Sequence, residues 1–313
     1  MMYISQKTSR LGRKISAKKI KTRTFTDSRA AVDAGELNPA GASDLNEVVF
    51  KDVIPSELLL TIILNERTLS TVSCSPANLI EFTVGYLMNN GYVDRFSDIS
   101  LLRICGRELN RIIKQDDLSI QIEVKADLPS KNLVPGINEE AILQPDIPKF
   151  ISSACGSIDD IMLYNKLEKI RSAARFDCKT ILKLNTESAS SQKLKKESGG
   201  LHSAALFDSS GKLIVIMEDI GRHNCIDKIA GFMQIKKTAP ADKVIYTTGR
   251  ISIDLIFKIA KMNVPLLVSN SSVTYSAALL AKKIQLTVVG YARGGRFNIY
   301  SYPKRIIAPC RFA

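Results

Sequence analysis

The chain of 313 residues has only two histidines, and both lie in one short block from Gly199 to Lys228. His202 follows two glycines and a leucine, and His223 lies beside Arg222 in the run from Glu218 to Asn224. A single histidine is usually a core or capping residue. Two histidines in a block rich in glycine, acids and arginine indicate a site, because imidazole changes charge near neutral pH and also serves as a neutral hydrogen-bonding group.

Three short loops combine glycine with arginine, and each follows a predicted strand. They contain Gly221-Arg222, Gly249-Arg250 and Arg293-Gly294-Gly295-Arg296. Glycine lets backbone amides approach a ligand, and the guanidinium fork matches phosphate or carboxylate oxygens. One such pair is ordinarily a turn with a surface arginine. Three of them at the carboxyl ends of strands, where open α/β sheets bind ligands, predict an anionic ligand such as a nucleotide pyrophosphate.

Cys155 is the candidate nucleophile. It lies in the small-residue run from Ser152 to Ser157, directly before a helix that Ser157 is expected to cap. A thiol at a helix N-terminus feels the positive end of the helix dipole, which lowers its pKa below the usual ~8.5 and favours the thiolate. The other cysteines are expected to be small buried hydrophobic residues; they are Cys74, Cys105, Cys178, Cys225 and Cys310.

The cysteine spacing predicts no metal site. No two cysteines lie within four residues of each other, so there is no Cys-x-x-Cys and no iron–sulfur or zinc-knuckle spacing. Cys225 lies near His223, but this pair has no evident fourth ligand. Scattered cysteines without a secretory signal indicate reduced thiols in the cytoplasm.

Composition indicates an ordinary globular protein, with 45% hydrophobic and 24% charged residues. No apolar run reaches the ~18 residues that span a bilayer, so no membrane role is expected. Eight of the basic residues behind the net charge of +13 lie among residues 1–25, which contain no acid. We therefore predict a disordered basic tail and linker over residues 1–46. No base-reading motif accompanies this tail, so a nucleic-acid partner is not expected.

Hydrophobic periodicity divides the remainder into residues 47–150 and 151–313. The first part is predicted to contain strands at 58–64, 68–73 and 119–124 and a helix from Ser75 to about Asn90, with Ser75 as N-cap and Pro76 in its first turn. The Pro-rich stretch 125–150 reads as a boundary or long loop.

The second part is predicted to begin with a helix capped by Ser157, with Arg171 and Arg175 near its end. A hairpin and an alternation of strands and helices follow. The expected strands are 201–207, 213–217, 244–247, 265–269, 286–291 and 297–302, and the expected helices are 224–233, 252–261 and 274–283. This rhythm indicates a layered α/β sheet that is parallel in its later part.

Five segments resemble motifs of the FdhD/NarQ family, the formate dehydrogenase accessory sulfurtransferases. They read SPANLIEFTVGYL (75–87), GGLHSAALFD (199–208), EDIGRHNCIDK (218–228), TTGRISIDLIFKIA (247–260) and VTYSAALLAKKIQLTVVGYARGGRFNIY (273–300). The resemblance runs from about Glu47 to Arg305. It implies a three-layer α/β/α, cytidine-deaminase-like mixed sheet with a smaller N-terminal α+β part and without the deaminase zinc.

The resemblance also implies an activity and a set of partners. The protein would be a cytoplasmic sulfur carrier or sulfurtransferase. It would take sulfur from a cysteine desulfurase and pass it to the molybdenum cofactor, bis-molybdopterin guanine dinucleotide, before this cofactor enters formate dehydrogenase. A homodimer is compatible with this role.

Residue roles follow by position. Cys155 matches the family's persulfide cysteine. The segment Tyr291, Ala292, Arg293, Gly294, Gly295 and Arg296 matches the segment that contacts the guanine dinucleotide. His202, Arg222, His223 and Arg250 are expected to shape the same pocket.

One departure from the family pattern leaves an alternative open. Many members have a second cysteine three residues after the first, and Ile158 stands there in this chain. Sulfur transfer through a single persulfide remains the leading interpretation. The alternative is a non-catalytic chaperone that binds the molybdenum cofactor without transferring sulfur.

Overall fold

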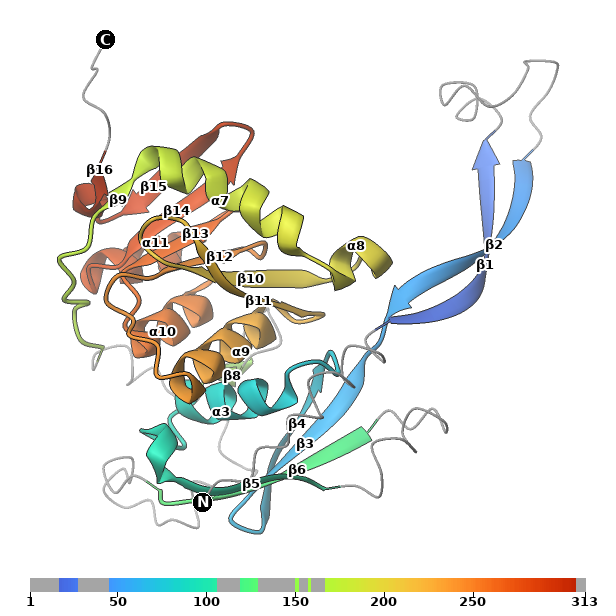
Figure 1. The fold of residues 1–313 in the computed structure, drawn as a ribbon, viewed down its shortest axis with the longest axis horizontal. Helices are drawn as coiled ribbons and strands as arrows, with labels where there is room; N and C mark the ends of the chain where they lie inside the picture. Colours follow the sequence, from blue (N-terminus) through green and yellow to red (C-terminus); the bar gives the residue numbers. More distant parts are fainter. Residues whose placement is uncertain are drawn as a thin grey trace.

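The computed structural model describes residues 17–27, 45–105, 119–128, 150–151, 157–158 and 167–307. Its main sheet has six strands in the order β11-β10-β12-β13-β14-β15 (Figure 1). The strands are β10 (His202–Phe207), β11 (Leu213–Asp219), β12 (Val244–Thr247), β13 (Leu266–Ser269), β14 (Thr287–Arg293) and β15 (Arg296–Ser301). β12, β13 and β14 are parallel to one another, while β10, β11 and β15 pair antiparallel with their neighbours. The predicted mixed sheet is confirmed.

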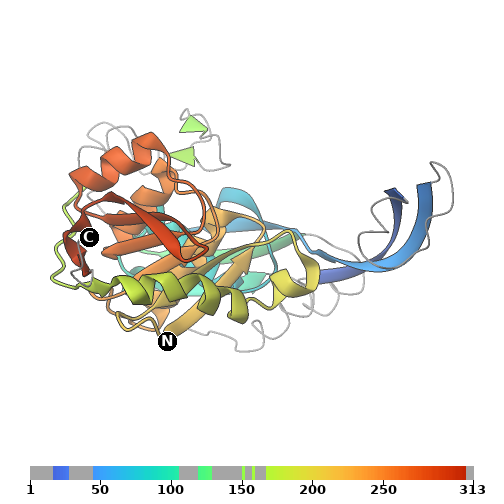
Figure 2. The same cartoon turned by 90° about the horizontal axis from the view of Figure 1, so that it is seen from above.

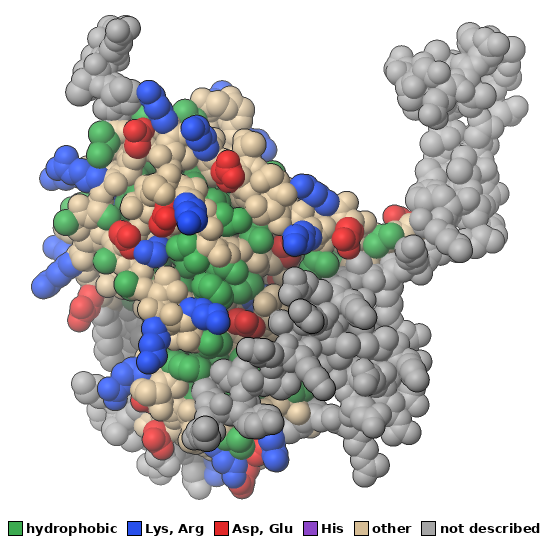
Figure 3. Space-filling view, in the orientation of Figure 1, with side chains coloured by type: hydrophobic (Ala, Val, Ile, Leu, Met, Phe, Trp, Pro, Cys, Tyr) green, Lys and Arg blue, Asp and Glu red, His purple; other side chains and the backbone are tan. Residues whose placement is uncertain are grey.

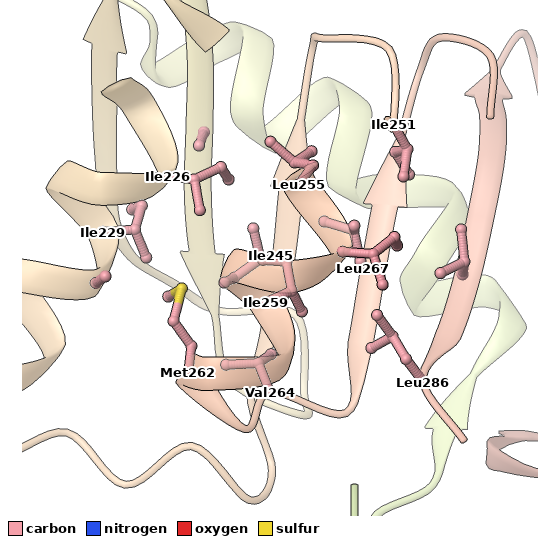
Figure 4. Packing of buried hydrophobic residues seen from close by; sticks show 14 of the residues in the cluster. Ile226, Ile229, Ile245, Ile251, Leu255, Ile259, Met262, Val264, Leu267 and Leu286 are labelled. Carbon is pink, nitrogen blue, oxygen red and sulfur yellow. The ribbon is translucent and has the colours of Figure 1, made fainter. Parts of the chain in front are cut away.

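Helices cover both faces of this sheet, which gives three layers (Figure 2). One face carries α9 (Arg222–Ile235), α10 (Ile253–Met262) and α11 (Tyr275–Lys283), and the other carries α7 (Cys178–Ser191). Alternate residues of a strand point to opposite faces. Accordingly, Ile245 packs with α9 and α10, whereas Val244 and Tyr246 pack with α7. Figure 4 shows Ile226 and Ile229 of α9 facing Leu255 and Ile259 of α10 over the sheet.

A smaller α+β part precedes this domain, as predicted. Its four-stranded sheet has the order β4-β3-β6-β5, and the α3 helix (Leu79–Asn89) packs on it. The strands are β3 (Leu58–Leu64), β4 (Arg67–Cys74), β5 (Ile99–Cys105) and β6 (Ser119–Ala126), with a 3-10 turn η1 (Phe96–Asp98) before β5. The apolar residues at every second position of β3 are buried against α3; they are Leu58, Leu60, Ile62 and Leu64.

Two glycines bring α3 against α9. A Cβ on Gly85 would lie 1.8 Å from the Asp227 carbonyl oxygen, and a Cβ on Gly231 would lie 1.8 Å from the Glu81 carbonyl oxygen. No side chain fits at either position, so the two helix backbones touch directly. This contact joins the N-terminal part to the three-layer domain.

The predicted disorder of residues 1–46 is wrong for residues 17–27. These residues form β1 (Ala17–Asp27), which pairs antiparallel with β2 (Leu45–Pro55) along its whole length. Both views show this ladder extending away from the two sheets (Figures 1 and 2). The β1 sequence contains Thr22, Thr24 and Thr26, and β-branched residues favour strands once a partner satisfies the backbone. The boundary at residue 150 stays a prediction, because residues 129–149 lie outside the described residues.

The helix predicted from Ser157 to about Arg175 is wrong wherever the structure describes it. Ser157–Ile158 form β8, which pairs with β7 (Phe150–Ile151), and residues 167–175 are not helical. Ile170 is buried, its backbone N–H donates to the Ile284 carbonyl at 2.8 Å, and its carbonyl accepts from Arg305 at 2.9 Å. The segment is not a helix because its backbone groups bond to residues that are distant in sequence and not to the next turn of the same segment.

Several short elements complete the fold, and sequence periodicity does not predict them. They are α8 (Leu194–Ser198), η3 (Pro303–Arg305) and the paired strands β9 (Phe176–Asp177) and β16 (Ile306–Ile307). Within the described residues, no helix has the length and apolar character needed to cross a membrane. On the face drawn in Figure 3, Lys and Arg side chains are interspersed with Asp and Glu.

Candidate functional site

The loops singled out by the sequence lie at one edge of the main sheet. This edge is the one formed by the carboxyl ends of the parallel strands β12, β13 and β14. The register pairs His202 with Asp219 and Ala204 with Thr247. The start of β10 therefore lies beside the ends of β11 and β12. Because β12, β13 and β14 are parallel, their carboxyl ends reach the same edge. The three Gly-Arg loops consequently share this edge, as the sequence predicts.

His202, Arg222 and His223 form the first cluster at the edge. Arg222 and His223 open α9, and His202 opens the neighbouring strand β10. Burial lowers the pKa of His202, and the charges of Arg222 and Lys195 lower it further. The Arg222 side chain passes over Gly249, where an added Cβ would lie 2.8 Å from the Arg222 Cβ. Gly249 therefore leaves the space that the arginine occupies.

His223 is the more deeply buried imidazole, with 7% of its surface exposed. Burial lowers its pKa to about 3, and the nearby charges of Lys258 and Arg222 add to the shift. Its Nε2 atom lies 3.4 Å from the Ser252 hydroxyl. At neutral pH both histidines are thus neutral, and they provide hydrogen-bonding groups while the arginines provide charge.

Two helices point their positive ends at this cluster without a side-chain cap. The N-cap residues are Gly221 for α9 and Ser252 for α10, and neither accepts a side-chain capping bond. By contrast, the Thr274 hydroxyl caps α11 by accepting from the Ala277 N–H at 3.3 Å. Uncapped N–H groups and the helix dipole favour anions. With Arg222 beside them, they form a site suited to phosphate or carboxylate.

The remaining Gly-Arg loops at the same edge are the loop with Arg250, which follows β12, and the β14–β15 hairpin. Arg250 is exposed, as are Arg293 and Arg296 at the hairpin, whereas Ala292 is buried. The hairpin turns at Gly294 and Gly295, whose φ angles of 60° and 74° favour glycine. Tyr291 also has a positive φ of 52°, and its ring lies 6.0 Å from the Arg293 guanidinium.

Hydrogen bonds link the loops along the edge from β12 to β14. The Ser269 hydroxyl donates to the Gly249 carbonyl at 2.8 Å, and the Tyr291 N–H donates to the Ser271 carbonyl at 2.9 Å. β14 is two strands away from β12, a separation of roughly 10 Å at the usual strand spacing. The hairpin arginines therefore share the edge with His202 and His223 without joining their cluster.

Cys155 lies outside the described residues and falls between β7 and β8 in the sequence. Because Ser157 belongs to a strand, the proposed helix start no longer supports a lowered pKa for this thiol. Two other cysteines are buried as predicted. Burial raises the pKa of Cys74 to about 12 and raises that of Cys225 as well, and the Asp219 carboxylate adds to both shifts. Cys178 is partly exposed.

The structure adds a buried ion pair that sequence reasoning missed. Asp219 and Lys228 are both fully buried, and the Lys228 Nζ lies 2.5 Å from Asp219 Oδ2. Both residues lie in the block from Gly199 to Lys228 that contains the histidines, and this position is the only feature of the sequence that connects them with the site. Charged residues are rarely buried, so a pattern of residue types does not predict that these two face each other inside the protein.

Glu218 fixes the short helix α8 near the histidines. Its carboxylate accepts three backbone N–H bonds, from Lys193 at 3.1 Å, Leu194 at 3.0 Å and Lys195 at 2.8 Å. This arrangement places Lys195 close enough to His202 to lower the pKa of that imidazole. Lys195 therefore adds to the positive charge around the first cluster.

Metal-binding groups do not gather among the residues that the structure describes: no three His, Cys, Asp or Glu side chains meet there. Asp219 is paired with Lys228, Glu218 is bonded to α8, and His223 faces a serine. The donor set at the edge suits an anion rather than a metal cation.

The chain is similar to known proteins over most of its length. The sequence profile of the FdhD/NarQ family matches residues 55–307. Two relatives called "Sulfur carrier protein FdhD" illustrate the similarity. That of Staphylococcus aureus (strain MRSA252) is 33% identical over 260 residues, covering 82% of this chain and 90% of the relative. That of Sulfolobus acidocaldarius is 30% identical over 257 residues, covering 82% and 92%.

A solved structure shares the fold. It is the crystal structure of a protein from Desulfotalea psychrophila described as a formate dehydrogenase accessory protein. It superposes with a TM-score of 0.66 at 21% sequence identity, covering 92% of this chain and 99% of that one. At this identity the likeness supports the fold alone.

Proposed function

Because the chain belongs to the FdhD/NarQ family, we propose that it is a cytoplasmic sulfur carrier that serves formate dehydrogenase. In this proposal Cys155 accepts sulfur from a cysteine desulfurase as a persulfide. The protein then passes the sulfur to the molybdenum cofactor before that cofactor is inserted into the enzyme. The molybdenum cofactor is its substrate.

The observation that carries the proposal is the cationic edge of the main sheet. The guanine-dinucleotide form of the cofactor bears pyrophosphates, which need positive partners. The edge offers Arg222 with the uncapped start of α9, Arg250 after β12, and, two strands away, Arg293 and Arg296 at the hairpin. Cationic groups spread along one edge suit a ligand with several anionic groups. The neutral imidazoles of His202 and His223 would contribute hydrogen bonds to the same ligand.

The sulfur step balances without an oxidant. The Cys155 thiolate attacks the outer sulfur of the donor's persulfide, a new S–S bond forms on Cys155, and the donor cysteine leaves as a thiolate. Release of that sulfur as sulfide needs two electrons. Two external thiols supply them by forming a disulfide, which returns Cys155 as a thiol. Ile158 leaves no cysteine three residues away for an internal disulfide, so one persulfide is the expected intermediate.

Intact-protein mass measurement tests the sulfur step. We expect one added sulfur after incubation of the full chain with a cysteine desulfurase and cysteine, located on Cys155 by peptide mapping. Cys155→Ala should abolish this adduct. Cys178→Ala is the matched control, because Cys178 is a partly exposed thiol on α7, and it should leave the adduct unchanged.

The same mass measurement distinguishes the sulfur carrier from the second candidate function, a cofactor-binding chaperone. Ile158 at the position of a second family cysteine favours a chaperone that binds the cofactor without transferring sulfur. A sulfur adduct on another cysteine, or none under desulfurase turnover, would contradict the persulfide on Cys155. Cofactor binding retained under those conditions would support the chaperone.

A further inference from the structure

The turn that carries Arg222 and His223 rests on the buried Asp219–Lys228 pair. We propose that this pair is a positioning device. It holds the turn between β11 and α9 against the connection between β4 and α3, and so sets the placement of Arg222 and His223. The inference rests on the contacts of these residues and does not depend on which substrate the site binds.

Asp219 accepts hydrogen bonds from four donors, two on each oxygen. Its Oδ1 accepts from the Gly221 N–H at 2.9 Å and from the Asn224 amide at 2.8 Å. Its Oδ2 accepts from the Ser75 N–H at 3.0 Å and from Lys228 Nζ at 2.5 Å. One carboxylate thus joins the turn, the α9 helix and the β4–α3 connection. Only an ionised carboxylate accepts on both oxygens in this way.

Lys228 is satisfied as completely as its partner. Besides Asp219, its ammonium donates to the Ser75 carbonyl at 3.3 Å and to the Glu218 carbonyl at 3.2 Å. Burial alone favours the neutral amine, but the Asp219 carboxylate outweighs it, and the pKa of Lys228 is raised. An ammonium has three N–H donors, and here all three have partners.

Two further bonds tie the turn to the N-terminal part. The Ile220 N–H donates to the Ser75 hydroxyl at 3.2 Å, and the Asn224 amide donates to the Ser73 carbonyl at 2.9 Å. Gly221 leaves room for Asn224 beneath it, since a Cβ there would lie 2.7 Å from the Asn224 side-chain nitrogen. The backbone N–H groups of the two residues before Arg222 therefore each have a side-chain acceptor, Ser75 Oγ for Ile220 and Asp219 Oδ1 for Gly221.

Stability alone does not explain such a pair. Well-packed apolar residues of similar volume often stabilise a core as well as a buried ion pair does. They would leave the N–H groups of Ser75 and Gly221 and one N–H of the Asn224 amide without acceptors. What the ion pair adds is a defined position for the turn and for the two side chains that follow it.

The two histidines provide a direct test, because each gives its own imidazole signals in an NMR titration. We would compare the full chain with Asp219→Asn and with the double variant Asp219→Asn/Lys228→Met. Asparagine has one acceptor oxygen, so the variants lose bonds on one side of residue 219. The turn should then loosen and admit water. The pKa of His223 should rise from about 3 toward the ~6.5 of a free imidazole.

A control of similar stability separates positioning from general destabilisation. Leu64→Ala makes a cavity in the core of the N-terminal sheet, at the end of the β3–β4 ladder away from Ser73, and should lower the melting temperature without moving the His223 pKa. An unchanged His223 pKa in a folded double variant would overturn the proposal. If both Asp219 variants fail to fold, Ser75→Ala decides, because it removes only the hydroxyl that Ile220 uses. Its His223 pKa should also rise, and an unchanged value would again overturn the proposal.

Discussion

The two histidines of the site differ from the usual imidazole in that the pKa of each is lowered, that of His223 to about 3. Burial is the main cause for each, and the surrounding cations reinforce it; these include Arg222, Lys195 and Lys258. A site with this much positive charge and few free acids suits an anion. The histidines contribute to its shape and hydrogen bonding, and their neutrality makes the protein sensitive to acid.

We predict that the free energy of unfolding falls as the pH drops below ~6.5. In the unfolded chain His223 takes up a proton near that pH, whereas in the folded protein its pKa is about 3. The unfolded state therefore binds more protons between these values, and stability rises with pH there. The loss between pH 7 and pH 5 from this residue should be about 2 kcal/mol. Urea unfolding at several pH values measures it.

The control for this prediction is His223→Gln, which keeps a polar side chain but cannot be protonated. Its stability should depend less on pH over the same range, with the remaining dependence coming partly from His202, whose pKa is also lowered. The same pH dependence in both proteins would show that His223 is not the group responsible.

Arg296 tests the role of the hairpin arginines. We predict that Arg296→Ala weakens the binding of GDP, used as a probe for the nucleotide part of the cofactor, by roughly tenfold or more. Losing a charge-assisted phosphate contact costs about 1.5–3 kcal/mol. Arg67→Ala removes an exposed arginine at the β3–β4 turn and should bind GDP as the parent does. Equal affinity in the Arg296 variant, measured by calorimetry, would contradict this pocket assignment.

At the scale of elements, the contact between α3 and α9 decides how the two parts of the molecule meet. Gly85 and Gly231 are enclosed by the backbone of the opposite helix. Neither glycine is needed for a special backbone angle inside its helix. Each is needed because no Cβ fits, so this interface tolerates no larger residue at these two points.

We predict that Gly231→Ala destabilises the protein by about 3 kcal/mol, although alanine is the better helix former. Its Cβ would lie 1.8 Å from the Glu81 carbonyl oxygen and would push the helices apart. Gly294→Ala is the matched control. Gly294 has a φ of 60° with open space around it, so the change should cost only about 1 kcal/mol of backbone strain. Chemical unfolding of both variants gives the comparison, and equal losses would count against the close contact.

At the scale of the whole molecule, several contacts link the N-terminal sheet to the three-layer domain. α3 touches α9 backbone to backbone, and Ser75 is bonded to Asp219 and Ile220. Both links bring the β4–α3 connection to the turn that carries the histidines. We therefore expect the two parts to unfold together.

We predict that Ile62→Ala lowers a single unfolding transition shared by both parts, by about 2–5 kcal/mol. Ile62 is fully buried in β3, far along the chain from the histidines. Circular dichroism should report the same midpoint as the imidazole NMR signals. Leu59→Ala, at a position on β3 that is 49% exposed, should change little. Histidine signals that persist after the N-terminal sheet has melted would show that the parts unfold independently.

Local patterning was enough to predict most elements of the main sheet. Strands and helices have different hydrophobic periods, and fully buried strands such as Val244–Thr247 and Leu266–Ser269 coincide with continuous apolar runs in the sequence. The order of strands and helices also placed Gly249 and Gly294 at one sheet edge, because the carboxyl ends of parallel strands share an edge. These features depend on neighbouring residues, which the sequence displays directly.

Tertiary contacts decided the rest. The pattern around Ser75 predicts a helix N-cap, but α3 begins at Leu79, and Ser75 instead bonds to Asp219, 144 residues away. Lys228 is buried because its ammonium finds Asp219 and two carbonyls, one of them 153 residues away. Whether a polar residue caps a helix or is buried depends on hydrogen-bond partners that come close only in the folded protein. The sequence therefore determined the layers and the edge that holds the site, and the tertiary structure decided which charges are buried there to position it.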